Sequence, residues 1–316
     1  MKNKIVIGVL AYNEEKYITK VITELSSLNL PLIIVDDCST DTTSNKLKNI
    51  NINNMTVLTN QKNLGAGDST KILLKQAEHK GFSFLIKVDG DDQFLIDDVR
   101  KIIDLYEQRH FDFIKSNRFW EGGIRGNIPK IRFFGNLLAT ILMQVSSGTN
   151  KVLDPLNGLF GVSVKINNFL KSRSYPKKYG YPYFITVTAL INNFKTFQLN
   201  NVVEYKDQKS QISTIRMFFL LLKLTIFFYI KKLNLKKTEG QFQRSAFFDY
   251  VFIFFLVTSF TFSSILIYSV FNTSNLIFSN TTLLIIVTTL IVSTIFIFSI
   301  SFKEEYKIRN RNIEIE

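Results

Sequence analysis

Residues 89–93 read Asp-Gly-Asp-Asp-Gln, a pattern whose residue types and spacing suit metal chemistry. A hard divalent cation that bridges a diphosphate needs oxygen ligands, and carboxylates two residues apart at a strand end supply them. The metal neutralises charge that builds on a departing diphosphate, and Gly90 permits a close approach of the backbone. We expect the carboxylates of this turn, Asp89 and Asp91, to bind a divalent cation, and a solvated acidic turn is the plainer alternative.

Carboxylates also follow a second apolar run, residues 32–35, where Asp36 and Asp37 are adjacent. Oxygens at this position can accept hydrogen bonds from a ribose or a base. Ser39 and Asp41, slightly later in the chain, offer the alternative of capping the next helix. We expect Asp36 or Asp37 to contact a ligand and the later residues to cap.

Two more segments complete a candidate nucleotide pocket. One follows the apolar residues 4–10, and the other, residues 63–67, carries two glycines. The second segment suits either a phosphate-binding turn or the plain start of a helix. The expected nucleotide-binding residues are Ala11, Tyr12, Asn13, Glu14, Asp36, Asp37, Asn63, Gly65, Asp89 and Gly90.

These polar clusters need a scaffold that brings strand ends together. Short apolar runs alternate with amphipathic stretches in the first part of the chain, and this alternation is typical of a parallel sheet with crossover helices. Ligands bind at the carboxyl ends of strands in such sheets, which is where the polar clusters fall. The expected strands are residues 4–10, 32–35, 55–59, 84–88 and 113–116, and the expected helices are residues 18–25, 43–50 and a segment from the 63–67 turn to about residue 80.

The following part of the chain is less regular. Residues 120–127 hold three glycines and are expected to form a mobile loop. Residues 129–147 begin with proline, which suits the first turn of a helix. Further strands are expected at residues 159–164 and 197–205, with a helix near residues 184–193 between them.

A long uncharged segment indicates a membrane. Between Tyr250 and Phe302 the sequence has no Asp, Glu, Lys, Arg or His. About 20 apolar residues cross a bilayer, so this segment predicts two helices, near residues 247–271 and 281–302, joined by a short polar turn. Basic residues flank both ends, and the positive-inside rule places both flanks in the cytoplasm. Two buried helices of a soluble bundle are the alternative.

Residues 212–235 mix lysine and arginine with many phenylalanines and leucines. Charges interrupt this stretch too often for a crossing helix, so we expect a helix in the membrane interface; a packed helix of the soluble domain is the alternative. The formal net charge of +13 suits anionic lipid or phosphorylated substrates. Nucleic acid is not an expected partner, because the sequence shows no basic and aromatic module of that kind. The single cysteine, Cys38, excludes an internal disulfide and a cysteine-based zinc site.

In order and spacing, the polar motifs resemble those of glycosyltransferase family 2, which has the GT-A fold; the motifs are residues 11–15, 36–41, 63–65 and 89–93. The resemblance covers about the first 210 residues. Four ordered motifs are specific for the family and the fold but not for the sugar. The resemblance implies a nucleotide-sugar donor, linked to UDP or GDP, with the metal, Mg²⁺ or Mn²⁺, and the diphosphate held at Asp89, Asp91 and Gln93 of the acidic motif.

Later segments are similar to the polyprenyl-phosphate glycosyltransferases, the subfamily that includes dolichyl-phosphate mannose synthase. They are residues 116–118, the glycine-bearing loop, residues 154–158 and the C-terminal helix pair. The resemblance implies that Arg118 and Arg132 clamp a lipid phosphate, which guanidinium geometry suits. It also implies that Asp154 lies near the acceptor, as a base or a positioning residue.

We therefore expect an inverting enzyme that moves a hexose from a nucleotide-sugar to undecaprenyl or dolichyl phosphate at the cytoplasmic membrane face. Asp91, Asp154, Arg118 and Arg132 are its expected catalytic residues. A family member with another glycolipid or glycan acceptor, and an inactive membrane scaffold with the same fold, are the alternatives, and a homo-oligomer is compatible with the sequence. The expected parts are a GT-A catalytic domain at residues 1–210, a juxtamembrane amphipathic helix at 211–245, a transmembrane hairpin at 246–303 and a cytoplasmic tail at 304–316.

Overall fold

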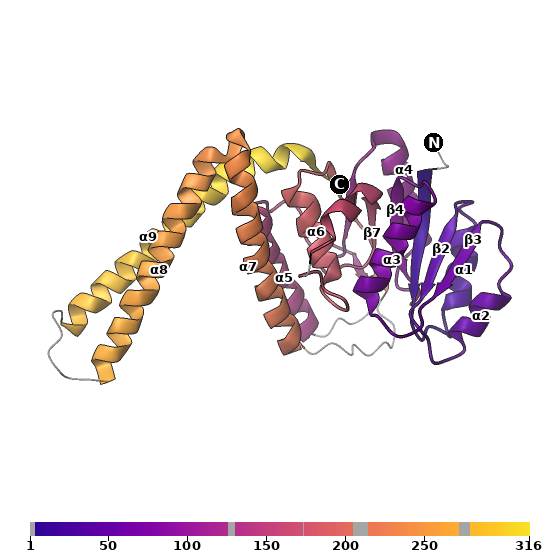
Figure 1. The fold of residues 1–316 in the computed structure, drawn as a ribbon, viewed down its shortest axis with the longest axis horizontal. Helices are drawn as coiled ribbons and strands as arrows, with labels where there is room; N and C mark the ends of the chain where they lie inside the picture. The colour runs from indigo at the N-terminus through magenta and orange to yellow at the C-terminus, as the bar shows by residue number, and fades with distance from the viewer. Residues whose placement is uncertain (1–3, 126–129, 173, 205–213, 272–278) are drawn as a thin grey trace. The chain divides into compact units, whose positions relative to one another are not determined.

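A computed structural model describes residues 4–125, 130–172, 174–204, 214–271 and 279–316. The chain divides into two compact units (Figure 1), which are Met1–Phe228 together with Asn312–Glu316, and Tyr229–Arg311. The first unit is an α/β domain, and the second is helical.

An eight-stranded sheet forms the centre of the first unit, in the order β10-β8-β5-β7-β4-β1-β2-β3. Neighbouring strands are parallel except at β7, which runs antiparallel to β4 and β5. The expected mostly parallel sheet is confirmed. The strands are β1 Ile5–Ala11, β2 Leu32–Asp36, β3 Met55–Thr59, β4 Phe84–Asp89, β5 Phe113–Asn117, β7 Phe160–Ser163, β8 Thr196–Asn200 and β10 Ile313–Ile315.

Helices pack on both faces of this sheet. Side chains at alternate positions of β1 are buried with side chains of α1 and α4 in one hydrophobic cluster. Gly8 of β1 faces α3, because a Cβ atom there would lie 3.1 Å from Leu73. Strands buried on both faces read as continuous apolar runs, and this is why the sequence reveals them. The helices of this unit are α1 Ile18–Ser26, α2 Thr43–Asn49, α3 Ala66–His79, α4 Ile96–Arg109, α5 Lys130–Ser147 and α6 Tyr181–Ile191.

Helix α4 is not among the elements expected from the sequence. Its residues are mostly polar, and only a narrow stripe that includes Val99 and Ile102 is buried. Asp97 and Asp98 lie in its first turn, where negative charge interacts favourably with the helix dipole and stabilises the helix. This acidic start is the signal that could have identified the helix.

The glycine-bearing loop is partly a strand. Ile124–Arg125 forms β6, which pairs in parallel with β9, Val203–Glu204. The expected strand at 197–205 is thus divided between β8 and β9. Residues 126–129, including the proline expected to start α5, lie outside the described residues.

Residues 304–316, expected as a cytoplasmic tail, consist of helix and strand, and their cytoplasmic placement stays a prediction. Helix α9, Asn280–Arg309, continues through the first of them, and β10 then joins the edge of the eight-stranded sheet beside β8. The pairing is reinforced by an ion pair between Arg109 and Glu314 and by a hydrogen bond from Lys151 Nζ to the carbonyl oxygen of Ile313 at 3.0 Å. A strand of three residues is too short to show a hydrophobic period, so the sequence does not reveal it.

Within the described residues after position 213, the α-helices are α7 Thr214–Thr238, α8 Gln243–Phe271 and α9. By length and composition, two segments of this described part can cross a membrane, Gln243–Val270 with a mean hydropathy of 2.1 and Thr281–Asn312 with 2.7. Few of their residues are buried, whereas the core helix of a soluble bundle would be buried. α8 and α9 lie side by side in Figure 1 and touch through the Phe252 and Phe298 rings, 5.1 Å apart. These observations favour the expected membrane hairpin over a soluble bundle.

The second unit buries a cluster of charged side chains where α7, α8 and α9 meet. Glu305 accepts from Lys232 at 3.0 Å, from Lys236 at 2.7 Å and from Arg309 at 2.5 Å. Lys236 also lies 2.5 Å from Asp249. All five side chains are almost fully buried, so each charge depends on its partners rather than on water. We call these five residues the hairpin ion cluster.

Candidate active site

Carboxylates at the end of β2 organise the neighbouring loops. Asp36 accepts hydrogen bonds from the Ser39 backbone at 3.0 Å and from the Ser39 hydroxyl at 2.6 Å. Asp37 accepts from the backbone amides of Leu64 at 2.8 Å and Gly65 at 2.7 Å. Both carboxylates are buried. They therefore shape the edge of the candidate nucleotide pocket, and direct contact with a ribose or a base stays a prediction.

The end of β1 is tied to the same region. The Ala11 carbonyl accepts the Asp37 amide at 2.9 Å, and the Asn13 side chain accepts the Thr40 amide at 2.8 Å. Asn13 has a φ of +57°, in the left-handed region that asparagine tolerates better than most residues. Tyr12 is 41% exposed, so its ring is available to a ligand. The structure thus brings the first two expected nucleotide-binding segments together.

The glycine turn at residues 63–67 makes a close contact within the protein. A Cβ atom on Gly67 would lie 2.0 Å from the Pro176 carbonyl oxygen, so only glycine fits there. The backbone amides of Gly67 and Asp68 donate to the carbonyl groups of Lys178 and Lys177 at 3.1 and 2.9 Å. This packing agrees with the helix-start alternative, and the phosphate-binding role stays a prediction.

Three carboxylates gather at the carboxyl ends of β1 and β4. Burial, followed by repulsion from Asp89, raises the pKa of Asp91 to about 7. Burial, followed by repulsion from Asp91 and Asp89, raises the pKa of Glu14 to about 8. Carboxylates that raise one another's pKa are held close together at a cost in electrostatic energy. A cation at this point would relieve the repulsion.

The donor atoms fit a metal that a diphosphate helps to hold. Among the described residues, no group of three or more Asp, Glu, His or Cys is arranged to enclose a metal. Mg²⁺ does not require such a cage, because one or two carboxylates and substrate phosphates suffice. Asp89 and Asp91 would supply the two carboxylates. The Gln93 backbone amide donates to Asp91 at 3.3 Å, which fixes the turn between them.

Asp89 is held from both sides. Lys87, two residues earlier on β4 and fully buried, donates to one carboxylate oxygen. The other oxygen packs against Gly158, where a Cβ atom would lie only 2.2 Å away. Gly90 is less confined, because its Cβ would lie 3.0 Å from the Leu10 carbonyl oxygen. The Asp89 side chain is thus held by neighbouring residues while 31% of it stays exposed, and its metal-binding role stays a prediction.

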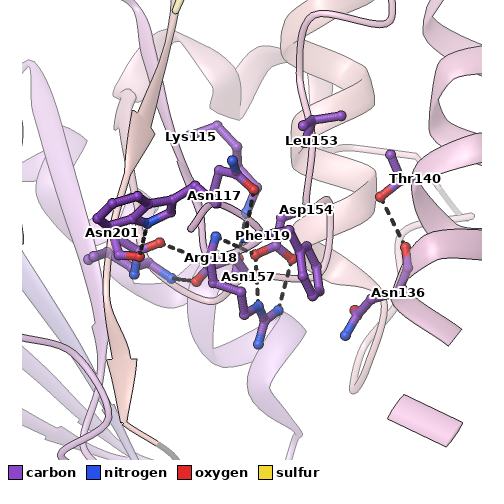
Figure 2. Close-up of polar contacts among 12 residues, drawn as sticks. Lys115, Asn117, Arg118, Phe119, Asn136, Thr140, Leu153, Asp154, Asn157 and Asn201 are labelled. Atoms are coloured by element: carbon purple, nitrogen blue, oxygen red, sulfur yellow. Dashed lines mark hydrogen bonds and ion pairs between the residues drawn. The ribbon is translucent and has the colours of Figure 1, made fainter. Parts of the chain in front are cut away.

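Arg118 and Asp154 form a buried two-pronged pair. Arg118 Nε donates to Asp154 Oδ2 at 2.7 Å and Arg118 Nη2 to Oδ1 at 2.9 Å, while the Arg118 backbone amide donates to Oδ2 at 3.1 Å. Figure 2 shows the guanidinium directed at the carboxylate. The arginine is 5% exposed and the aspartate is fully buried. The structure brings the two expected residues together, with the carboxylate committed to the guanidinium.

A pocket of about 430 Å³ opens beside this pair. Its wall combines the Arg118 guanidinium with aromatic and aliphatic side chains, a mixture that suits an amphiphile with an anionic head. The lining residues are Arg118, Phe119, Trp120, Gly122, Ile124, Phe133, Leu137, Thr140 and Leu153. We call this the arginine pocket.

Helix α5 contributes to this pocket and also has an exposed apolar face. Ile131 and Phe134 are each 63% exposed, and Leu137 and Ile141 are each 50% exposed. Arg132 lies on the first turn of the same helix and is half-buried. The helix and Arg132 were expected from the sequence, whereas the exposed apolar face was not. Counting apolar residues around the helix could have found it.

Two fully buried lysines lie beneath the site and were not expected from the sequence. Lys87 of β4 and Lys115 of β5 both pair in register with Phe160 of β7, so they share one face of the sheet. Burial lowers the pKa of Lys115 to about 7, against the attraction of Asp154. A lysine inside a strand of a buried parallel sheet is unusual, and this was the available signal.

Comparison with known proteins identifies the family. The family model described as glycosyl transferase family 2 matches residues 6–169, just over half of the chain. The chain belongs to glycosyl transferase family 2. The first four sequence motifs are therefore those of the family, the fold is GT-A, and the protein is a glycosyltransferase.

Relatives of this glycosyltransferase include proteins from archaea. An uncharacterized protein of Methanocaldococcus jannaschii is 27% identical over 228 residues, covering 69% of this chain and 96% of that protein. The UDP-N-acetylglucosamine–dolichyl-phosphate N-acetylglucosaminyltransferase of Methanococcus voltae is 28% identical over 195 residues, covering 57% of this chain and 77% of that enzyme. The crystal structure of Staphylococcus aureus TarS residues 1–349 with UDP-GlcNAc has a TM-score of 0.47 at 20% identity, covering 73% of this chain and 70% of that one.

Proposed function

We propose that this glycosyltransferase moves a hexose from a nucleoside diphosphate sugar to a polyprenyl phosphate. The observation that carries the proposal is the arginine pocket, in which Arg118 lies among mainly aromatic and aliphatic residues. A polyprenyl phosphate has matching parts, an anionic head and a long hydrocarbon tail. The pocket is joined to the acidic turn by residues 154–158, since Asp154 holds Arg118 and Gly158 packs against Asp89.

The proposed reaction is a single displacement with inversion. An acceptor phosphate oxygen attacks the anomeric carbon, the new oxygen–carbon bond forms, and the bond to the nucleoside diphosphate breaks with its electron pair. Mg²⁺ or Mn²⁺, when bound with the diphosphate at Asp89, Asp91 and Gln93, supplies positive charge to the leaving group. The acceptor phosphate is already ionised at neutral pH, so no strong base is needed. Asp154 then serves to hold Arg118 rather than to remove a proton.

UDP-N-acetylglucosamine is the first donor that we propose to assay. The Methanococcus voltae relative is named for UDP-N-acetylglucosamine and dolichyl phosphate, which supports this pair as the first to assay. UDP and GDP sugars remain the donor classes to compare. The carboxylates of the acidic turn carry no information on the sugar, so a panel of donors is required.

We also propose that the catalytic unit lies at the cytoplasmic face of the membrane. β10 follows the hairpin in sequence and belongs to the same sheet as β8 and β5, which precede the hairpin, so the two ends of the hairpin share one side. The exposed apolar face of α5 suits contact with lipid. An impermeant thiol reagent applied to intact cells tests the orientation: a cysteine introduced at position 275, outside the described residues, should react, and one near Asn312 should not.

The decisive assay is transfer by the purified full chain in detergent, with a nucleotide-sugar panel and polyprenyl phosphate. Replacing Arg132 by Ala should raise the acceptor KM and lower turnover by roughly 10- to 150-fold, the scale of a lost charge-assisted contact. Donor binding should change little. Arg100, which pairs with Asp97 on the surface of α4, provides the matched control Arg100→Ala.

Arg118 needs a milder change than Arg132. Its removal would leave the buried Asp154 carboxylate without its partner, which costs stability as well as activity. Arg118→Lys keeps the charge but cannot make the two-pronged contact, so we expect partial activity with a raised acceptor KM. Weakened donor binding with an unchanged acceptor KM would show that the arginines contact the donor and not the acceptor. Transfer only to a glycan or another glycolipid would show that polyprenyl phosphate is not the acceptor. Absence of any metal-dependent donor turnover would favour an inactive scaffold.

A further inference from the structure

Residues 154–158 connect the arginine pocket with the acidic turn. This segment is bound by a lysine of the sheet that the proposed mechanism does not use. Lys115 is fully buried on β5, and its Nζ atom donates to the Asn157 carbonyl oxygen at 2.6 Å. Figure 2 shows the Lys115 side chain reaching this segment beside Arg118 and Asp154. We call residues 154–158 the bridging loop.

The bridging loop needs such an anchor because its conformation is not one that the chain adopts freely. Asp154 has a φ of +54°, in the left-handed region. A non-glycine residue there is strained, and it persists only where surrounding contacts hold it. The loop has few bonds of its own, among them the Asn157 amide to the Asp154 carbonyl at 3.2 Å. The Lys115 ammonium adds a short bond from the rigid sheet.

Each end of the bridging loop carries one half of the site. At its start, both oxygens of Asp154 hold the Arg118 guanidinium in the arginine pocket. At its end, Gly158 leaves room for the Asp89 carboxylate, with a Cβ position 2.2 Å from the nearer oxygen. A shift of the loop therefore moves Arg118 and crowds Asp89 at the same time. Displacements of about 1 Å in such geometry cost ~100-fold in rate.

The same loop extends to the wall of the pocket through a second chain of hydrogen bonds. The Asn157 side chain donates to Asn201 Oδ1 at 2.9 Å, and the Asn201 carbonyl accepts from Trp120 Nε1 at 2.8 Å. Asn157 and Asn201 are both fully buried. Trp120 lines the arginine pocket and is the only tryptophan in the chain.

We infer that Lys115 is a positioning residue that sets the separation of the acceptor-side arginine and the donor-side carboxylate by holding the bridging loop. It acts through Asn157 and contacts neither substrate. The kinetic part of this inference rests on the proposed function. The structural part does not, because the Lys115–Asn157–Asn201–Trp120 chain exists whichever acceptor the enzyme uses.

The test compares Lys115→Met, which keeps the length of the side chain and removes its donor, with Lys195→Met. Lys195 is a suitable control because its ammonium also donates to a main-chain carbonyl, that of Arg109 at 2.8 Å, but on the protein surface. For the full chain in detergent, three measurements are compared: the Trp120 emission spectrum with its quenching by acrylamide, donor affinity by calorimetry, and the steady-state constants for both substrates.

We expect Lys115→Met to change the emission and quenching of Trp120, to lower kcat ~10- to 100-fold and to raise the acceptor KM, with donor affinity within about twofold of the parent protein. Lys195→Met should match the parent protein in all three. If the methionine variant does not fold, Lys115→Gln, which is uncharged and whose side chain ends one atom short of the lysine nitrogen, replaces it in the comparison.

The outcomes separate this inference from the proposed function. Unchanged Trp120 emission and quenching in Lys115→Met overturns the positioning role, with any acceptor. An equal loss of donor affinity, acceptor affinity and thermal stability also overturns it, because that result marks a general structural role. Absence of transfer to polyprenyl phosphate by the parent protein overturns the proposed acceptor instead, and the fluorescence comparison still decides the role of Lys115.

Discussion

Two regions of this molecule hold clusters of charged side chains, and the two regions differ in how the charge is balanced. In the hairpin ion cluster, three cations surround two carboxylates, with Glu305 bound by Lys232, Lys236 and Arg309. At the acidic turn of the catalytic unit, carboxylates face one another, and repulsion contributes to the raised pKa values of Asp91 and Glu14. In the first region every carboxylate is matched by at least one cation, with one positive charge in excess, whereas the second region has an excess of negative charge.

The difference separates a structural use of charge from a catalytic one. A matched buried cluster fixes the mutual register of its helices, because any slip would leave a charge without its partner. An unmatched cluster destabilises the ligand-free protein and is relieved when a cation binds. Excess like charge at strand ends is therefore the better indicator of a site, and the absolute number of buried charges is not.

The largest effect should come from Asp91→Asn, which removes one carboxylate from the unmatched cluster. Loss of a transition-state charge interaction of ~3–4 kcal/mol slows turnover ~100-fold or more. Thermal stability should be unchanged or slightly higher, because the substitution relieves repulsion with Asp89. Paired measurements of turnover with saturating Mg²⁺ and of the unfolding midpoint check this. Normal turnover in the variant would remove Asp91 from the metal site.

The next effect should come from Glu305→Gln, which leaves three buried cations facing a neutral side chain. Breaking a buried ion pair in this way costs ~3–5 kcal/mol, so the unfolding midpoint in detergent should fall markedly. Glu304→Gln is the control, because Glu304 pairs at 3.1 Å with Lys307, whose side chain is 59% exposed. Exposed ion pairs of this kind contribute little to stability. Equal midpoints for the two variants would contradict a structural role for the hairpin ion cluster.

The smallest effect should appear in the pH dependence of the ligand-free catalytic unit. Asp91 and Glu14 have pKa values of about 7 and about 8, above the ordinary values of 3.8 and 4.5. The folded state therefore binds their protons more tightly than the unfolded chain, so their contribution to stability is complete below the ordinary values and is lost as pH rises through 7 to 8.

The measurement that follows is the unfolding midpoint between pH 5 and 9, with and without Mg²⁺ and a nucleoside diphosphate. The ligand-free midpoint should decline by a few degrees as pH rises, and the stabilisation by metal and nucleotide should be larger at pH 8 than at pH 6. In Asp91→Asn both trends should flatten. A ligand-free midpoint that rises across this range would show that these carboxylates are not repelling one another.

Sequence patterns predicted the apolar strands, the polar motifs that follow them and the long uncharged segment. Continuous apolar runs located β1 to β5 because the sheet is buried on both faces, and the acidic motif stood out because it follows such a run. The uncharged segment after Tyr250 gave the hairpin by length alone.

Features that depend on contacts between distant segments escaped the sequence. Lys87 and Lys115 read as interruptions of apolar strands until the structure shows them beneath Asp89 and Asn157. The pairing of Arg118 with Asp154 joins residues far apart in the chain. Lys232 and Lys236 counted as basic residues of an interfacial helix, and their buried partners on α8 and α9 could not be read from spacing.

Strand β10 has a consequence for the order in which the molecule is made. It pairs with β8 only after both hairpin helices have been synthesised, because the hairpin lies between the two strands in the chain. Until then the β8 edge, with its open backbone groups, is available to other chains. A ribosome therefore completes helices α8 and α9 before it completes the eight-stranded sheet. If these helices cross a membrane as proposed, the last strand couples closure of the sheet to insertion of the helix pair.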